Sequence, residues 1–408
     1  MRKLGIVAVV AFLSMSSTLF AEGATKLISQ TPMTLVATLS PSEQTVNMVV
    51  KGNLIYLVGT ITGVVSTDGY IQALDATGSV QWSLPLDNGS NEIATAATFD
   101  PNGNLWVVGS SQVPHISPSD TATATPAVLN PDGISADSLV PMRKDLSALI
   151  LWKVSPAGAL LATYFKEVGA PFLVRGAIFA NNAINVVGII ATPTGHAGFL
   201  LQTDLSGAIG KPLLLGKRDT ELNALVKKSN GSLVLLGSSS ETIAKQTRKG
   251  IRDGIVIVIS QTGKISSVIR SSNSASRRSW QSGTNSYFLG GDSIGPTKRE
   301  AVITKFASTL VPTWTMRFAS TGPALTADSP TSHFLAFPTI GVVAGVKGWK
   351  PSKSSALTLS LDSKGALNGA FGAAPIASPI AIGFSRELGV VLLGRGPTGV
   401  SVFHTLPR

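Results

Sequence analysis

The chain has 408 residues, a formal net charge of +11, only 13% charged residues and no cysteine. The missing cysteine excludes disulfides, thiol catalysis, cysteine-bound metals and lipoprotein attachment. The length suits one large all-β domain. The 41 glycines, between short Val, Ile, Leu and Ala runs, favour many short strands joined by tight turns.

The first 21 residues have the pattern of an export signal. Two basic residues precede an uncharged apolar run (5–13), and small and polar residues follow up to Ala21. We expect cleavage after Ala21, with an uncleaved membrane anchor as the alternative. A linker (22–30) and a single domain (31–408) would follow. The protein is thus expected to be a monomer, secreted or held in the cell envelope, with no other transmembrane segment.

An apolar strand pattern that ends in glycine recurs along the chain, and we interpret the glycine as the residue where the chain leaves the strand. A looser strand and a hairpin turn with Asn-Gly chemistry precede most copies. A polar loop, a third strand, a second turn and a fourth strand follow most of them. The seven copies are Asn53–Gly59, Asn104–Gly109, Ala183–Gly188, Ser232–Gly237, Ser286–Gly290, Gly341–Gly345 and Gly389–Gly394.

Units of four strands that repeat at roughly 50 residues predict propeller blades. One interval is longer, and its surplus lies in the loop Ser110–Asp145. The last unit lacks a fourth strand, whereas Met33–Leu39 is a spare one. Its pairing with Val400–Thr405 would close the ring and cover an exposed strand edge. We therefore predict an all-β, seven-bladed β-propeller with four antiparallel strands per blade. Six or eight blades are the alternatives if the fifth or sixth repeat is misread.

The order of strand–Gly, polar loop, strand–Asp-x-x-Gly and strand resembles the repeats of secreted bacterial seven-bladed β-propeller proteins over nearly all of the predicted domain. The segment Ala73–Trp82 also resembles the tryptophan-docking repeat of the pyrroloquinoline-quinone dehydrogenases, although one residue is missing between Asp75 and Thr77. The second resemblance implies a quinone-dependent dehydrogenase. The other blades lack the tryptophan at that place, apart from Trp314 in a turn without the glycine, so we expect no cofactor.

The loops between second and third strands, and those between blades, emerge on one face of a propeller. Function usually lies on such loops. Their positive charge, concentrated in the second half of the chain, predicts binding to an anionic polymer or protein of the cell envelope, and Trp349 is expected to be an exposed contact residue. The alternative is that the charges only keep the protein soluble. The predicted binding residues are Lys245, Arg248, Lys249, Arg252, Arg277, Arg278, Lys298, Lys347, Trp349, Lys350 and Lys353.

Few residues indicate catalysis, so a non-enzymatic binding or scaffold module is the main prediction and no catalytic residue is assigned. The four histidines, His115, His196, His333 and His404, lack metal-ligand spacing. The alternative is a hydrolase or lyase at the channel mouth. It would require His196, His333 and Asp292 to meet there, or Asp219 and Glu221 to form an acid–base pair.

Two stretches rich in Asp and Asn offer oxygen ligands of the kind that calcium prefers. We interpret the first, Asp100–Asn104, as a hairpin turn. The second, Asp87–Glu92, links the first and second blades. It leaves calcium open as an alternative, although no metal ligand is assigned.

Overall fold

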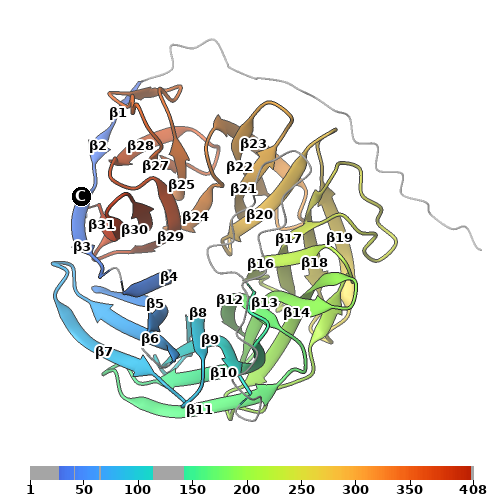
Figure 1. Ribbon diagram of the computed structural model, residues 1–408. Coiled ribbons are helices and arrows are strands. Elements are labelled where there is room, and N and C mark those ends of the chain that lie inside the picture. Colours follow the sequence, from blue (N-terminus) through green and yellow to red (C-terminus); the bar gives the residue numbers. More distant parts are fainter. Residues whose placement is uncertain (1–26, 41, 64–65, 114–141, 406–408) are drawn as a thin grey trace, which may run out of the picture.

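The computed structural model describes residues 27–405, apart from 41, 64–65 and 114–141. These residues form seven antiparallel sheets arranged in a ring, the seven-bladed β-propeller that the sequence predicts (Figure 1). In each blade the first strand lies nearest the axis, and the strands follow one another outwards in chain order, except that the N-terminal β3 (Thr34–Thr38) is the outermost strand of the seventh blade. The described residues contain no helix, and none could therefore span a membrane as a helix.

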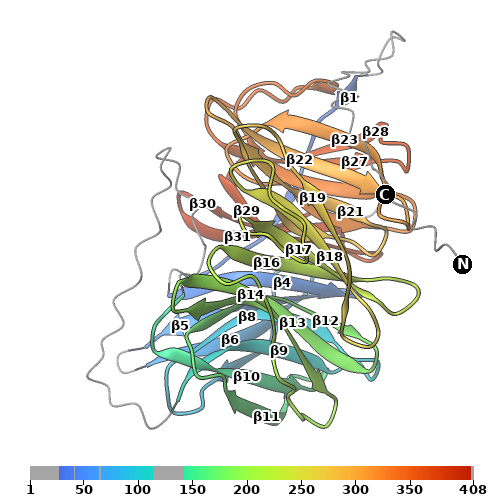
Figure 2. The same ribbon diagram turned by 90° about the vertical axis from the view of Figure 1, so that its right-hand side faces the viewer.

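The first blade contains β4 (Glu43–Lys51), β5 (Leu54–Thr62), β6 (Thr67–Leu74) and β7 (Val80–Leu86). The second contains β8 (Glu92–Phe99), β9 (Leu105–Gln112), β10 (Leu146–Val154) and β11 (Leu160–Glu167). The third contains β12 (Phe172–Ala180), β13 (Ala183–Thr192), β14 (Gly195–Asp204) and β15 (Leu213–Leu215). The fourth contains β16 (Thr220–Lys227), β17 (Leu233–Ser239), β18 (Asp253–Ile259) and β19 (Ile265–Ser271). Figure 2 shows the ring from the side of the third and fourth blades.

The fifth blade contains β20 (Arg277–Gly283), β21 (Phe288–Ile294), β22 (Arg299–Phe306) and β23 (Pro312–Ala319). The sixth contains β24 (Leu325–Asp328), β25 (His333–Thr339), β27 (Ser355–Leu361) and β28 (Leu367–Ala373). The seventh contains β29 (Ser378–Ser385), β30 (Gly389–Gly396), β31 (Gly399–His404) and β3 (Thr34–Thr38).

The N-terminal part of the described chain closes the ring, as predicted. Strand β3 pairs antiparallel with β31, with Leu35 opposite Phe403, and Figure 1 shows this blue strand beside the red ones of the last blade. Two shorter strands extend the closure over blade 6. β2 (Thr31–Pro32) runs parallel to β28, and β1 (Ile28–Ser29) runs parallel to β26 (Val346–Lys347). Residues 28–30 therefore lie along the edge of the ring.

The prediction for the sixth repeat is wrong in its strand assignment. The glycine-ended segment Gly341–Gly345 is not a strand but part of the loop between β25 and β27. The segment His333–Phe337, predicted to be the first strand, belongs to the second strand, β25, and the first is the short β24. The blade count is unaffected, because the blade still contains four antiparallel strands.

The recurring glycine does not end its strand, as we interpreted it, but lies within it. In blade 2 the innermost strand has a bulge at Thr95, between the residues that pair with Gly109 and Val108. The bulge brings the carbonyl oxygen of Ile93 to the position that a Cβ on Gly109 would occupy. The same arrangement recurs at Gly59, Gly188 and Gly237. In blade 5 the glycine opposite the bulge is Gly291 and not Gly290, with which the predicted copy ends. Only glycine fits opposite such a bulge without moving the backbone.

We expect Gly109→Ala to lower the free energy of unfolding by about 3 kcal/mol, since the new methyl group would displace the bulged strand. Chemical denaturation measures this change. Gly295→Ala is the control: its Cβ would lie 3.7 Å from the nearest heavy atom, the Lys298 carbonyl oxygen, and should change stability by less than about 0.5 kcal/mol. Equal effects of the two substitutions would contradict the role assigned to the glycine.

Aromatic side chains on the outermost strands pack against the next blade. Trp82 on β7 covers Gly158, in the turn before β11, so closely that a Cβ there would overlap the indole. Tyr164 on β11 covers Gly207 of blade 3 in the same way, and Trp314 on β23 lies over Gly365 of blade 6. The segment Ala73–Trp82 therefore has a packing role here.

Candidate functional site

The predicted binding residues lie, as expected, in loops and at strand ends on the face where second strands lead into third strands and one blade leads into the next. The structure divides them by exposure. Arg252 and Arg277 are half-buried, and Arg278 and Trp349 are buried. The exposed ones are Lys245, Arg248, Lys249, Lys298, Lys347, Lys350 and Lys353.

The expectation that Trp349 is an exposed contact residue is wrong. Its side chain is 6% exposed and belongs to the hydrophobic core of blade 6, with Val343 and Val346. The indole also packs beside Gly372 and Gln30, on the segment that closes the ring. Lys347 and Lys350 on either side of it remain exposed, so the lysines, and not Trp349, are the predicted residues of this loop that a partner could contact.

Two of the predicted arginines are engaged inside the protein. Arg278 is 4% exposed, and its guanidinium lies 4.4 Å from the centre of the Trp280 ring. Burial lowers the pKa of Arg278 to about 9. Arg252 pairs with Asp219 at 2.6 Å and with Glu221 at 3.3 Å. Neither guanidinium is directed at a partner in solution.

Three exposed cations line one cleft above the junction of blades 3 and 4, which we call the basic cleft. It has a volume of about 610 Å³. Among the described residues, none of the three cations forms an ion pair with a carboxylate. Lys217 and Arg218, in the short connection before β16, were missed by sequence reasoning, which considered only the longer loops. The cleft is lined by Lys217, Arg218, Arg248, Ser240, Glu241 and Thr242.

Glu241 is the only carboxylate of the basic cleft, and the backbone already engages it. The amide groups of Lys217, Arg218 and Asp219 donate to its oxygens at 2.8–3.0 Å. Burial would raise the pKa of Glu241, but these backbone hydrogen bonds outweigh burial and lower it. The carboxylate therefore fixes the loop that carries the two cations, while their side chains remain exposed.

Charged residues do converge near the axis, between blades 3 and 4. His196 Nε2 on β14 lies 3.4 Å from Glu221 Oε1 and 3.6 Å from Asp219 Oδ1, and Arg252 contacts both carboxylates. Burial would raise the pKa of Glu221, but Arg252, His196 and Arg175 outweigh it and hold the pKa well below its usual range. Because Glu221 is stabilised in its ionised form, it is poorly suited to general acid–base catalysis near neutral pH.

The residues required for the predicted enzyme alternative do not meet. His333 begins β25 on the opposite face, against expectation, and its Nδ1 lies 2.7 Å from Asp328 Oδ1. Asp292 on β21 pairs with Arg299 at 2.7 Å, and burial raises its pKa. His404 is buried at the end of β31, and its Nδ1 has no hydrogen-bond partner among the described residues. His115 and most of the loop Ser110–Asp145 lie outside the described residues.

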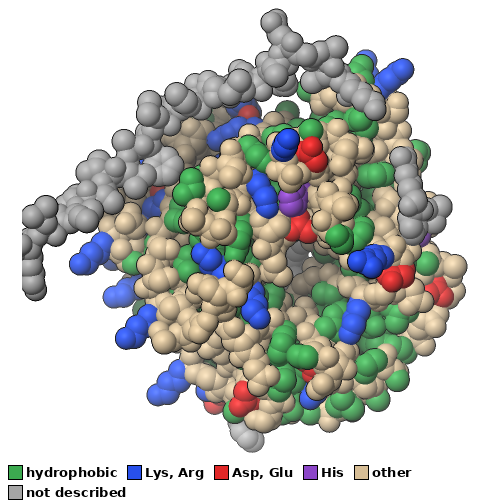
Figure 3. Space-filling model, turned by 180° about the vertical axis from the view of Figure 1, so that it is seen from behind, with side chains coloured by type: hydrophobic (Ala, Val, Ile, Leu, Met, Phe, Trp, Pro, Cys, Tyr) green, Lys and Arg blue, Asp and Glu red, His purple; other side chains and the backbone are tan. Residues whose placement is uncertain are grey.

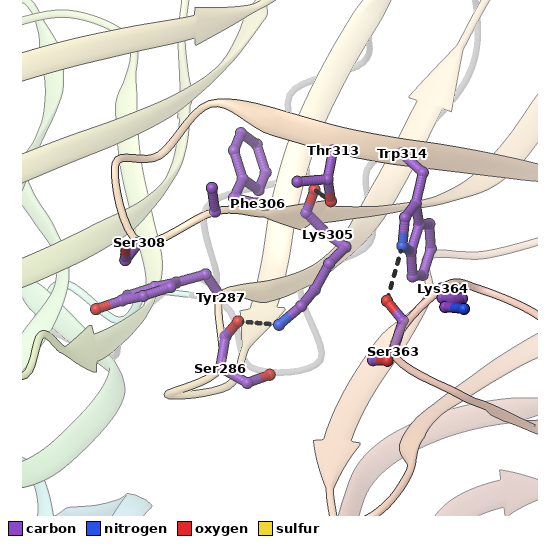
Figure 4. Close-up of a pocket in the computed structure, with 10 residues that line it drawn as sticks. Ser286, Tyr287, Lys305, Phe306, Ser308, Thr313, Trp314, Ser363 and Lys364 are labelled. Atoms are coloured by element: carbon purple, nitrogen blue, oxygen red, sulfur yellow. Dashed lines mark hydrogen bonds between the residues drawn. The ribbon is translucent and has the colours of Figure 1, made fainter.

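A larger cleft of about 710 Å³ lies between blades 5 and 6, on the face of the hairpin turns (Figure 4). Its polar groups are paired with one another: Lys305 Nζ donates to the Ser286 carbonyl, and Trp314 Nε1 donates to the Ser363 carbonyl at 3.3 Å. Figure 3 shows one face of the ring with a central hollow and with Lys and Arg side chains spread around it.

No protein-family model matches the chain, and no curated protein matches it. Among solved structures it is similar to the β-propeller domain of the Trilobed protease from Pyrococcus furiosus, with 9% identity and a TM-score of 0.49 over 90% of this chain and 96% of that one. YCF48 bound to D1 peptide gives 12% identity and a TM-score of 0.49 over 94% and 98%. Chaetomium thermophilum Sqt1, bound to the N-terminus of the ribosomal protein L10, gives 12% and 0.47 over 91% and 100%. The likeness extends to the propeller fold alone.

We expect Arg252→Met to reduce the free energy of unfolding at neutral pH by about 2 kcal/mol, because Glu221 and Asp219 lose their cation. Since the pKa of Glu221 is lowered in the folded protein, its stabilisation is present above the ordinary glutamate pKa of about 4.3 and is lost as the pH falls below it. The variant should lose less stability over that acidic range than the natural protein.

Denaturation curves recorded between neutral and acidic pH test this expectation. Arg248→Met is the matched control, because Arg248 lies in the same loop but is exposed. Its pH dependence should follow that of the natural protein. Parallel curves for the Arg252 variant would show that the cluster does not hold Glu221 in its ionised form.

Proposed function

We propose that the protein is an exported, non-enzymatic binding module that holds an anionic partner of the cell envelope in the basic cleft. The observation that carries the proposal is the convergence of Lys217, Arg218 and Arg248 on one hollow, where the only carboxylate is engaged by backbone amides. Export is supported by the signal pattern of residues 1–21, which lie outside the described residues.

The chemistry of the cleft suits a carboxylate or phosphate group. Guanidinium groups bind such anions through two parallel hydrogen bonds, and the two arginines of the cleft come from different loops. The exposed Lys245 and Lys249 extend the positive surface beyond the cleft. Exposed cations attract a charged polymer over several ångströms, and salt weakens this attraction.

The predicted binding set changes accordingly. Lys217 and Arg218 join it, and Lys245, Arg248 and Lys249 stay in it. Arg252, Arg278 and Trp349 leave it because they are engaged inside the protein. The remaining cations of blades 5 and 6 are not part of the cleft. They are Arg277, Lys298, Lys347, Lys350 and Lys353, and Lys298 is paired with Glu300 at 2.8 Å.

The enzymatic alternatives have less support. The carboxylates nearest the axis, Asp219 and Glu221, are paired with Arg252. The tryptophan of the segment that resembles a quinone-dehydrogenase repeat packs on Gly158 of the next blade. Neither arrangement favours a hydrolase, a lyase or a quinone-dependent dehydrogenase over a binding module.

We expect the triple variant Lys217→Gln, Arg218→Gln, Arg248→Gln to bind heparin, a model anionic polymer, roughly tenfold more weakly at low salt. It should also elute from a heparin column at lower salt, and its retention on a native cell-envelope fraction should fall. Each substitution removes one charge from the cleft while leaving Glu241 and its backbone hydrogen bonds in place.

The matched control is Lys227→Gln, Lys264→Gln, Arg386→Gln. These three residues are exposed in hairpin turns on the opposite face, so the control loses the same net charge. It should bind heparin nearly as tightly as the natural protein. Equal losses in the two triple variants would mean that binding follows net charge alone, and the proposed site would then be wrong.

A further inference from the structure

Three carboxylates meet where blade 1 passes into blade 2, on the same face as the basic cleft but at another part of the ring. Asp68 lies near the start of β6, Asp87 directly follows β7, and Glu92 begins β8. Because Gly69 pairs with Leu86, the antiparallel register brings Asp68 and Asp87 close together. One carboxylate oxygen of each of the three residues lies within 4.8 Å of the other two.

The cluster contains buried acceptors that nothing in the described part of the chain satisfies. Glu92 is 0% exposed, and Ser90 and Ser111 donate to its Oε1 at 2.8 and 3.3 Å. Its Oε2 is buried and has no hydrogen-bond partner among the described residues, and the same is true of Asp68 Oδ1. A buried oxygen acceptor without a partner destabilises the folded protein. These atoms therefore point to a ligand that supplies positive charge.

The described part of the chain supplies no such charge. No described Lys, Arg or His forms an ion pair with Asp68, Asp87 or Glu92. The surrounding polar groups instead fix the geometry. The Gly89 amide donates to Asp87 Oδ1 at 2.7 Å, and the Thr67 amide donates to Asn91 Oδ1 at 3.0 Å. The linking segment Asp87–Glu92 is thus held against the start of β6.

We propose that Asp68, Asp87 and Glu92 form a calcium site that joins blades 1 and 2. Hard divalent cations take oxygen ligands, and Ca²⁺ binds them at about 2.4 Å. Carboxylate oxygens that lie within 4.8 Å of one another can therefore contact one Ca²⁺ together. Mg²⁺ demands near-ideal octahedral geometry and gives up its waters reluctantly, so three carboxylates from separate segments suit Ca²⁺ better.

The other stretch rich in Asp and Asn, Asp100–Asn104, differs from this cluster because its carboxylate already has partners. Asp100 accepts hydrogen bonds from the Asn102 and Asn104 amides, from Asn104 Nδ2 and from Trp106 Nε1. Its carboxylate is therefore saturated within the hairpin, as the sequence interpretation expected. Among the described residues, Asp100 belongs to no group of three ligands such as Asp68, Asp87 and Glu92 form.

Calorimetric titration of the chelator-treated full chain with CaCl₂, and thermal unfolding with and without CaCl₂, test the proposal. We expect binding of about one ion per chain and a rise in the unfolding temperature. Mg²⁺ should bind more weakly. Glu92→Gln keeps the shape of the side chain and should weaken Ca²⁺ binding at least tenfold. Asp87→Asn, at an exposed position, should also weaken it and serves if the Glu92 variant fails to fold.

Glu387→Gln is the matched control, because Glu387 is exposed in a hairpin turn on the opposite face. Its Ca²⁺ affinity should equal that of the natural protein. No heat and no thermal shift at millimolar CaCl₂, Mg²⁺ binding as tight as Ca²⁺ binding, or full Ca²⁺ affinity in both site variants would each overturn the proposal. The result is independent of the heparin experiment, since the calcium site shares no residue with the basic cleft.

Discussion

The constraint on which the ring depends is the bulge in the innermost strand opposite a glycine of the second strand. In blade 2 the bulge lies at Thr95 of β8. Gly109 of β9 has no side chain and so leaves room for the carbonyl oxygen of Ile93. The bulge twists the inner strand and turns one polar residue toward the neighbouring blade. Thr95 Oγ1 donates to the Val174 carbonyl of blade 3 at 2.9 Å.

The same device links other blades around the axis. In blade 4 the bulged Asn223 donates its Nδ2 to the Trp280 carbonyl at 2.9 Å. In blade 1 the bulge lies at Val46, and the next residue, Asn47, donates its Nδ2 to the Thr95 carbonyl at 2.9 Å. In blade 3 the bulged residue is Arg175, whose charge helps to lower the pKa of Glu221. In these blades the bulge thus also places polar and charged groups at the blade junctions.

Much of the fold could be predicted from the sequence because its signals are local. Hairpin turns and alternating apolar residues identify most strands, and the spare strand at residues 33–39 matches the missing one at the C-terminus. The sixth repeat was misread because blade 6 has no bulge in β24. Strand β25 therefore needs no glycine opposite a bulge. The loop segment Gly341–Gly345, which has apolar residues between glycines, was mistaken for the glycine-ended strand.

The candidate sites were harder to predict because they depend on contacts between distant segments. Trp349 lies between two lysines in the sequence, but the chain around residue 30 packs beside it and helps to bury it. Lys217 and Arg218 become part of a cleft only because Glu241 draws their loop toward the one that carries Arg248. The sequence interpretation did not associate Asp68 with Asp87 and Glu92, because these residues meet only through the pairing register of β6 and β7.

Aromatic residues of the outermost strands pack on turn glycines of the next blade and hold some neighbouring blades together at the rim of the ring. Blades 1 and 2, 2 and 3, and 5 and 6 are clamped at the rim by Trp82, Tyr164 and Trp314. Between blades 3 and 4 this clamp is missing, since β15 has only three residues and nothing lies within 4 Å of a Cβ on Gly263. The ion pairs of Arg252 and the basic cleft lie at this same junction. Blades 3 and 4 share a buried apolar core. At this unclamped rim the charged contacts add to that core, so ionic conditions affect how firmly the two blades are held together.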